Sequence, residues 1–170
     1  MPGIQLLYRD FNGDEAFLIG NVSGLSDGML SSILPKYGAV YTDVFKADPS
    51  DICEKVKERM RLYLQVQDYT DVHAVDRMSF ELTRTEDDLM QAIAKALGKE
   101  LSSSDSETIG SLSRFLRIRL GDIKGIYKIS GELSEKVTDA INAFYAYVVF
   151  DILFIEFEGY MVMIVFGSDE

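Results

Sequence analysis

The chain has 170 residues, of which 47% are hydrophobic, 26% charged and 11% aromatic, and its formal net charge is −11. This length and composition are typical of one globular domain and exclude a disordered, collagen-like or disulfide-stapled chain. The single cysteine cannot form an internal disulfide, and no paired Cys and His spacing indicates a zinc site. We therefore expect one domain over residues 1–170.

The first predicted element is an N-terminal hairpin. Asn12-Gly13 separates Ile4–Phe11 from Asp14–Gly20, and this dipeptide is the strongest short signal for a two-residue hairpin turn. Ser26 is then expected to cap a short helix that Pro35 and Gly38 help to end.

The middle of the chain alternates strands and helices. β-branched and aromatic residues predict a strand over Ala39–Phe45. Asp48 and Pro49 indicate the start of an amphipathic helix. Its apolar positions are Ile52, Val56, Met60 and Tyr63. The alternation over Met78–Thr83 predicts a half-buried strand.

Three helices are expected before the C-terminus. Thr85 is expected to cap the first of them and Gly98 to end it. Ser104 with Glu107 predicts a capping box for the second. The inner face of this second helix is Ile109, Leu112, Leu116 and Leu120. A short strand is expected within Gly121–Gly131, and Ser130 introduces the third helix.

The last predicted elements are the strands Val148–Phe157 and Tyr160–Phe166, joined at Glu158-Gly159. Both are apolar on both faces, which is typical of central strands covered by helices. Hairpins at both ends favour an antiparallel or mixed sheet. The sequence therefore predicts an α+β fold in which about five helices cover the sheet.

The chain start and its apolar runs suggest a compartment. The first residues have no basic start and no long apolar stretch, so no secretory signal is expected. The longest apolar run, Ala143–Phe157, is shorter than the roughly 20 residues that a spanning helix needs, and it contains Asp151 and Glu156. We expect a cytoplasmic protein with no membrane partner.

No motif for catalysis, metal or cofactor binding stands out. His73 lies among aspartates without metal-ligand spacing, and we interpret it as a solvated histidine. Cys53 lies in the first turn of its helix, beside the apolar positions, and we interpret it as a residue at the edge of the core. Asp151 lies inside an apolar run and should meet an arginine, a cap or a pocket. No cofactor is expected.

Charged residues are unevenly distributed along the chain. Residues 114–128 carry five basic side chains against Asp122 alone, and Ile118 is expected to face outward among them. This pattern is that of a contact surface made by Arg114, Arg117 and Ile118, or of an ordinary solvated face. Residues 68–88 carry seven acids and two bases. The candidate partner-binding acids are Asp68, Asp71, Asp76, Glu86, Asp87 and Asp88.

Three functions follow from these patterns. The first is a protein-binding or inhibitory domain whose acids bind a basic protein; net charge this negative opposes binding to nucleic acid. In general profile, a small acidic α+β domain without motifs is similar to bacterial immunity proteins, which mask basic sites of nuclease-type toxins. That similarity is one of class and composition. The second is a self-associating structural or regulatory domain that forms a homo-oligomer, and the third is a small enzyme that uses carboxylates.

Overall fold

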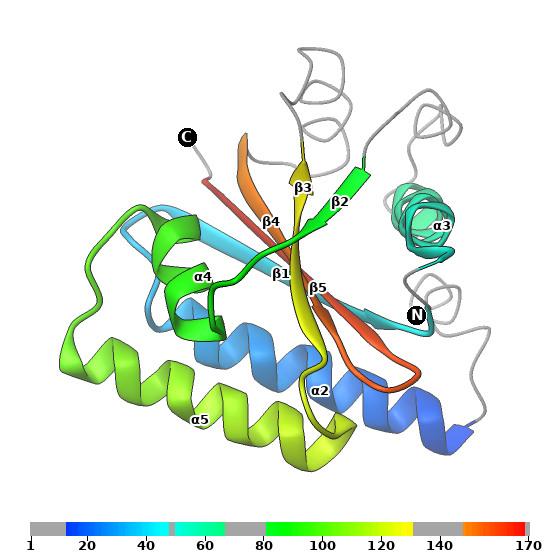
Figure 1. Ribbon diagram of the computed structural model, residues 1–170, viewed down its shortest axis with the longest axis horizontal. Helices are drawn as coiled ribbons and strands as arrows, with labels where there is room; N and C mark the ends of the chain where they lie inside the picture. Colours follow the sequence, from blue (N-terminus) through cyan, green and yellow to red (C-terminus); the bar gives the residue numbers. More distant parts are fainter. Residues whose placement is uncertain (1–12, 48–49, 67–80, 131–147, 169–170) are drawn as a thin grey trace.

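The computed structural model describes residues 13–47, 50–66, 81–130 and 148–168 (Figure 1). In these ranges the chain forms an antiparallel sheet of five strands in the order β1-β5-β4-β3-β2. The strands are β1 (Gly38–Phe45), β2 (Glu81–Arg84), β3 (Gly125–Ser130), β4 (Val148–Glu156) and β5 (Met161–Ser168). Helices and an antiparallel sheet confirm the expected α+β class.

Strands β4 and β5 form the C-terminal hairpin that the sequence predicts, and they lie in the middle of the sheet. In the turn between them, Gly159 has a φ of +78°, which glycine adopts without steric cost. The backbone N–H of Phe157 donates to the carbonyl of Tyr160 at 2.8 Å. Residues 152–155 of β4 and 161–166 of β5 are all buried, so both faces of the hairpin are covered as expected.

Three helices cover one face of the sheet: α2 (Gly13–Ser31), α4 (Leu89–Leu97) and α5 (Ser103–Leu120). Helices α2 and α5 run side by side in opposite directions (Figure 1). The predicted inner face of α5 is confirmed, because all four of its members are buried. The core between these helices and the sheet includes Ile19, Leu30, Ile93, Ile109, Leu112, Leu153, Val162, Ile164 and Phe166.

Helix α3 (Ile52–Val66) contacts the opposite face of the sheet through a buried ion pair. Nε of Arg59 donates to Oδ2 of Asp43 on β1, and Nη2 donates to Oδ1, each at 2.7 Å. The Arg59 guanidinium also lies over the ring of Phe45, 6.0 Å from its centroid. Ile52 and Val56 are buried, as the amphipathic pattern predicts. A two-point charge-assisted contact of this kind fixes the position of the helix as well as its attachment.

Removal of one member of the Asp43–Arg59 pair would take from the other its two-point charged contact, where both side chains are almost fully buried. We expect Asp43→Ala to lower the free energy of unfolding by about 3 to 5 kcal/mol, measured by urea denaturation. The double variant Asp43→Leu/Arg59→Met should lose much less, because no charge remains buried. Asp122→Ala, at an exposed carboxylate, is the control, and an equal loss there would contradict the assignment.

The predicted N-terminal hairpin is wrong for its second half. Residues 13–20 are the first two turns of α2, and Ser26 lies inside this helix instead of starting it. Ile19, Val22, Ser26 and Leu30 are buried at spacings of three, four and four, which is one face of a helix packed on the sheet. Asp14 and Glu15 in the first turn interact favourably with the helix dipole. Residues 4–11 lie outside the described ranges.

Two helix starts also differ from the prediction, each by a few residues. Asp88, not Thr85, caps α4 and forms a capping box with Gln91. Ser102 forms the capping box of α5 with Asp105, in place of Ser104 with Glu107. Gly98 ends α4 in the left-handed conformation, as expected. The described ranges hold four helices; the helix expected after Ser130 falls on residues 131–147, outside them.

Polar side chains are buried where α2 packs against β1. Ser23 and Ser26 are 8% and 1% exposed, and within the described residues their hydroxyls have no hydrogen-bond partner. Burial raises the pKa of the neighbouring Asp27 carboxyl to about 6. The backbone amide of Thr42 offsets part of that rise, and the carboxylate of Asp43 adds to it. The ionised form of Asp27 therefore destabilises the fold.

This raised pKa predicts a pH dependence of stability. Between about pH 4 and pH 6 the Asp27 carboxyl binds more protons in the folded protein than in the unfolded chain, so its contribution to the free energy of unfolding falls as the pH rises. We expect Asp27→Asn to remove this fall and to add about 1 to 3 kcal/mol at pH 7, allowing for the partial exposure of the side chain. Urea denaturation from pH 4 to pH 8 measures both effects. Parallel curves for the variant and the wild type would contradict the assignment.

Candidate functional site

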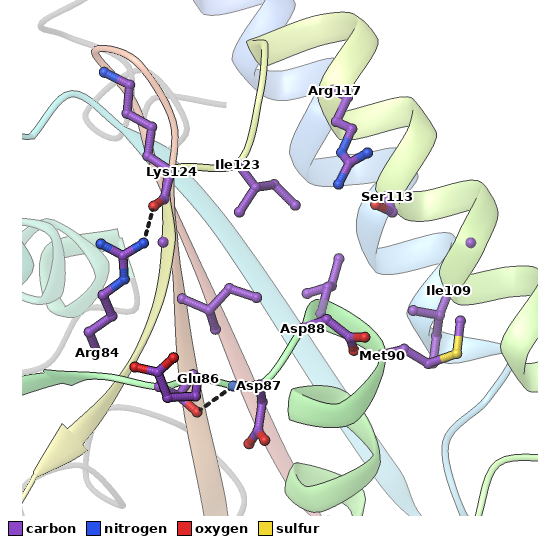
Figure 2. A pocket seen from close by; sticks show the side chains of 15 residues that line it. Arg84, Glu86, Asp87, Asp88, Met90, Ile109, Ser113, Arg117, Ile123 and Lys124 are labelled. Carbon is purple, nitrogen blue, oxygen red and sulfur yellow. Dashed lines mark hydrogen bonds between the residues drawn. The ribbon is translucent and has the colours of Figure 1, made fainter.

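A cleft of about 490 Å³ lies between α5 and the connection from β2 to α4. Figure 2 shows its walls: residues 84–90 on one side, α5 on the other, and the start of β3 between them. Four apolar residues line the cleft: Leu89, Ile109 and Ile126, which are buried, and Ile123, which is partly exposed. Its lining therefore offers apolar surface to a bound group, together with the charged groups of both walls.

The wall formed by the β2–α4 connection is acidic. Both carboxylate oxygens of Asp87 accept hydrogen bonds from Nζ of Lys95 at 2.8 Å, and this ammonium group lowers the pKa of Asp87. Oδ1 of Asp88 accepts from the backbone N–H of Gln91 at 2.8 Å as the helix cap. Glu86 is exposed and has no ion pair within the described residues. Two of the three acids are therefore engaged, and Glu86 remains available to a ligand.

The opposite wall carries a cation on α5. Arg117 is exposed and makes no ion pair with any described residue; its guanidinium reaches toward the cleft beside Ser113 (Figure 2). Arg84 is engaged differently, because its Nη2 donates to the carbonyl of Lys124 at 2.8 Å. The side chain of Lys124 extends away from the cleft (Figure 2). Within the described part of the chain, an acid and a base without ion-pair partners thus face the same space from opposite walls.

The structure brings four of the predicted binding residues together at this cleft: Glu86, Asp87, Asp88 and Arg117. Arg114 and Ile118 are also exposed but do not line the cleft. They lie elsewhere on the surface of α5, so the predicted contact surface of Arg114, Arg117 and Ile118 is divided between two places. Asp68, Asp71, Asp76 and His73 lie outside the described ranges.

The two other candidates have structural surroundings. Asp151 accepts a hydrogen bond from the backbone N–H of Ile152 at 2.8 Å and lies 3.8 Å from Nζ of Lys128, at the bulge in β4. Its charged neighbour is therefore a lysine, where an arginine was one of the expected partners. Cys53 lies at a smaller cavity beside Leu82 and Tyr127, and burial raises the pKa of its thiol. A raised pKa disfavours the reactive thiolate and agrees with a place at the edge of the core.

Several lining residues were missed by sequence reasoning, among them Ser113, Ile123 and Gly110. The one available signal was Gly110 itself, a glycine in the middle of a helix, where it costs stability relative to alanine. In the structure it forms part of the cleft wall. Among the described residues, no three His, Cys, Asp or Glu side chains are grouped so that they could hold a metal ion.

Comparison with known proteins found no match: no family model, no curated protein and no solved structure corresponds to this chain. Within the described ranges, no helix has both the length and the apolar character needed to cross a membrane.

Two glycine substitutions should have opposite effects on stability. At Gly110 an added Cβ would meet only Nη1 of Arg114, at 3.8 Å, so Gly110→Ala is expected to raise the free energy of unfolding by about 0.5 to 1 kcal/mol. At Gly98 the φ of +63° disfavours any side chain, and Gly98→Ala should lower it by about 1 kcal/mol. Urea denaturation measures both; a loss at Gly110 would contradict the described helix.

Proposed function

We propose that this chain is a binding protein that masks a basic partner, and that the cleft between α5 and the β2–α4 connection receives a segment of that partner. One observation carries the proposal: Glu86 and Arg117 face the cleft from opposite walls without ion pairs among the described residues, next to an apolar lining. A bound segment would place a basic side chain against Glu86 and a carboxylate or carbonyl oxygen against Arg117. Its apolar portion would contact Ile109 and Ile123.

The charge of the whole chain supports a basic partner. A net charge of −11 accelerates the approach of a positively charged protein and opposes an acidic one. The three consecutive acids at residues 86–88 concentrate part of this charge at the rim of the cleft. In the inhibitory form of the proposal, the acidic chain binds over a basic site of its partner and excludes other ligands from that site.

The test begins with capture of partners from a lysate of the source organism at low and moderate salt. We expect a basic protein that is retained at low salt and released at moderate salt, because exposed charges are screened beyond about 10 Å at 0.1 M. The captured protein is then purified and its dissociation constant is measured by calorimetry. An empty capture at low salt would overturn the proposal.

Variants of the purified chain locate the binding site. Glu86→Lys reverses one wall charge, and Gly110→Leu fills part of the cleft from a helical position with open space beside it. Each is expected to weaken binding by about tenfold or more, which corresponds to about 1.4 kcal/mol. Glu100→Lys makes the same charge change at an exposed residue that does not line the cleft. A partner that binds all three variants equally would show that the cleft is not the site.

A further inference from the structure

The surface of α2 that faces away from the sheet is unusually poor in charge. No residue from Ala16 to Ser26 is charged, although Phe17 is 77% exposed and Leu25 is 46% exposed. An added Cβ at the exposed Gly24 would meet no atom within 4 Å, so the backbone here is open to close approach. A helix at the surface of a protein normally carries charged or polar side chains on its solvent face.

The adjacent helix α5 presents a complementary line of residues. Glu107, Ser111, Arg114 and Ile118 follow each other at spacings of four, three and four, which places them along one side of the helix. Ile118 is 81% exposed, the largest value among the exposed apolar residues of the described ranges. Glu107 has no ion pair within the described residues, and Arg114 donates to the Ser111 hydroxyl, at 3.2 Å. We refer to Phe17, Gly24, Leu25, Glu107, Arg114 and Ile118 as the outer helical face.

We infer that the outer helical face binds a second copy of this chain in a two-fold symmetric dimer. A two-fold interface is self-complementary, since each contact between residues i and j occurs twice. If the two α5 helices cross in opposite directions at Gly110 and Ser111, Arg114 of each copy lies opposite Glu107 of the other. The small residues at this crossing point allow the helix axes to approach closely.

The charge of the chain favours this face over the rest of the surface for self-association. Two copies that each carry −11 repel one another wherever acids meet acids. On the outer helical face, the one acid and the one base cancel, and the four remaining members are uncharged. The opposite charges of Glu107 and Arg114 make the face attractive to its own copy, and Phe17, Leu25 and Ile118 supply apolar area that association removes from water.

None of the six residues of the outer helical face lines the cleft, although Gly110, at the proposed crossing point, does. Glu86→Lys therefore separates the two proposals, and its failure to weaken partner binding would leave the dimer standing. A monomeric chain would likewise leave the cleft proposal standing.

Sedimentation equilibrium of the full chain over a range of concentrations tests the inference. We expect a reversible monomer–dimer equilibrium in the wild type. Glu107→Arg and Arg114→Glu should each weaken the dimer by at least tenfold, because each places like charges opposite one another twice. An equimolar mixture of the two variants should form a heterodimer, and the double variant should recover a dimer close to that of the wild type.

Two further variants separate the interface from a general effect of net charge and from a loss of folding. Lys36→Glu makes a charge reversal like that of Arg114→Glu at an exposed site off the face and should leave the equilibrium unchanged. Ile118→Asp should abolish the dimer while the circular dichroism spectrum stays that of the wild type.

A chain that is monomeric at every concentration overturns the inference, as does a mixture of the two charge variants that fails to associate. A monomer that sediments with phosphatidylserine vesicles would assign the face to an anionic membrane instead.

Discussion

The two central strands, β4 and β5, carry apolar side chains on both faces, and the rest of the structure depends on covering them. One face is covered by α2, α4 and α5, which together form a continuous apolar core with the sheet. On the other face, Arg59 of α3 donates two short hydrogen bonds to the carboxylate of Asp43 on β1. A buried ion pair contributes little net stability compared with an apolar pair, but it fixes register, so its value here is to define where α3 lies.

The cleft is a consequence of how the first face is covered. The short strand β2 leads into α4, and the cleft lies between this connection and α5, with the start of β3 between them (Figure 2). Three other charged groups of this region make contacts within the chain. Asp87 binds Lys95, Asp88 caps α4, and Arg84 donates to the Lys124 carbonyl. Glu86 and Arg117 are the members of the two walls whose charges the described structure does not use internally.

Much of the fold could be predicted from sequence because its strongest patterns are local. The inner face of α5 and the C-terminal hairpin follow from apolar spacing and from a turn glycine, and both are confirmed. The hairpin predicted at Asn12-Gly13 is wrong for the opposite reason. A two-residue turn signal competes there with a whole helical face that is stabilised by packing on the sheet. A short stretch of sequence contains no information about such tertiary packing.

The site could be predicted only in part. Exposure of Arg114, Arg117 and Ile118 follows from helical spacing, but their division between the cleft and the outer surface depends on the neighbours of α5. The meeting of residues 86–88 with Arg117 depends on the turn of the chain through α4, which no local pattern encodes. The open space beside Gly110 is likewise a property of the assembled helices.

The position of Asp27 has a consequence for the edge of the described sheet. Among the described strands β1 lies at one edge, and its Thr42 backbone amide lowers the pKa of the nearby Asp27 carboxyl on α2. Unpaired amides of an edge strand are templates for strands of other molecules, and a nearby charge is one of the means by which proteins prevent this pairing. With a pKa of about 6, this carboxylate is charged at neutral pH, where it opposes pairing at the edge, and it loses its charge in mildly acidic solution. Resistance to edge-to-edge aggregation and intrinsic stability therefore change in opposite directions with pH at the same side chain.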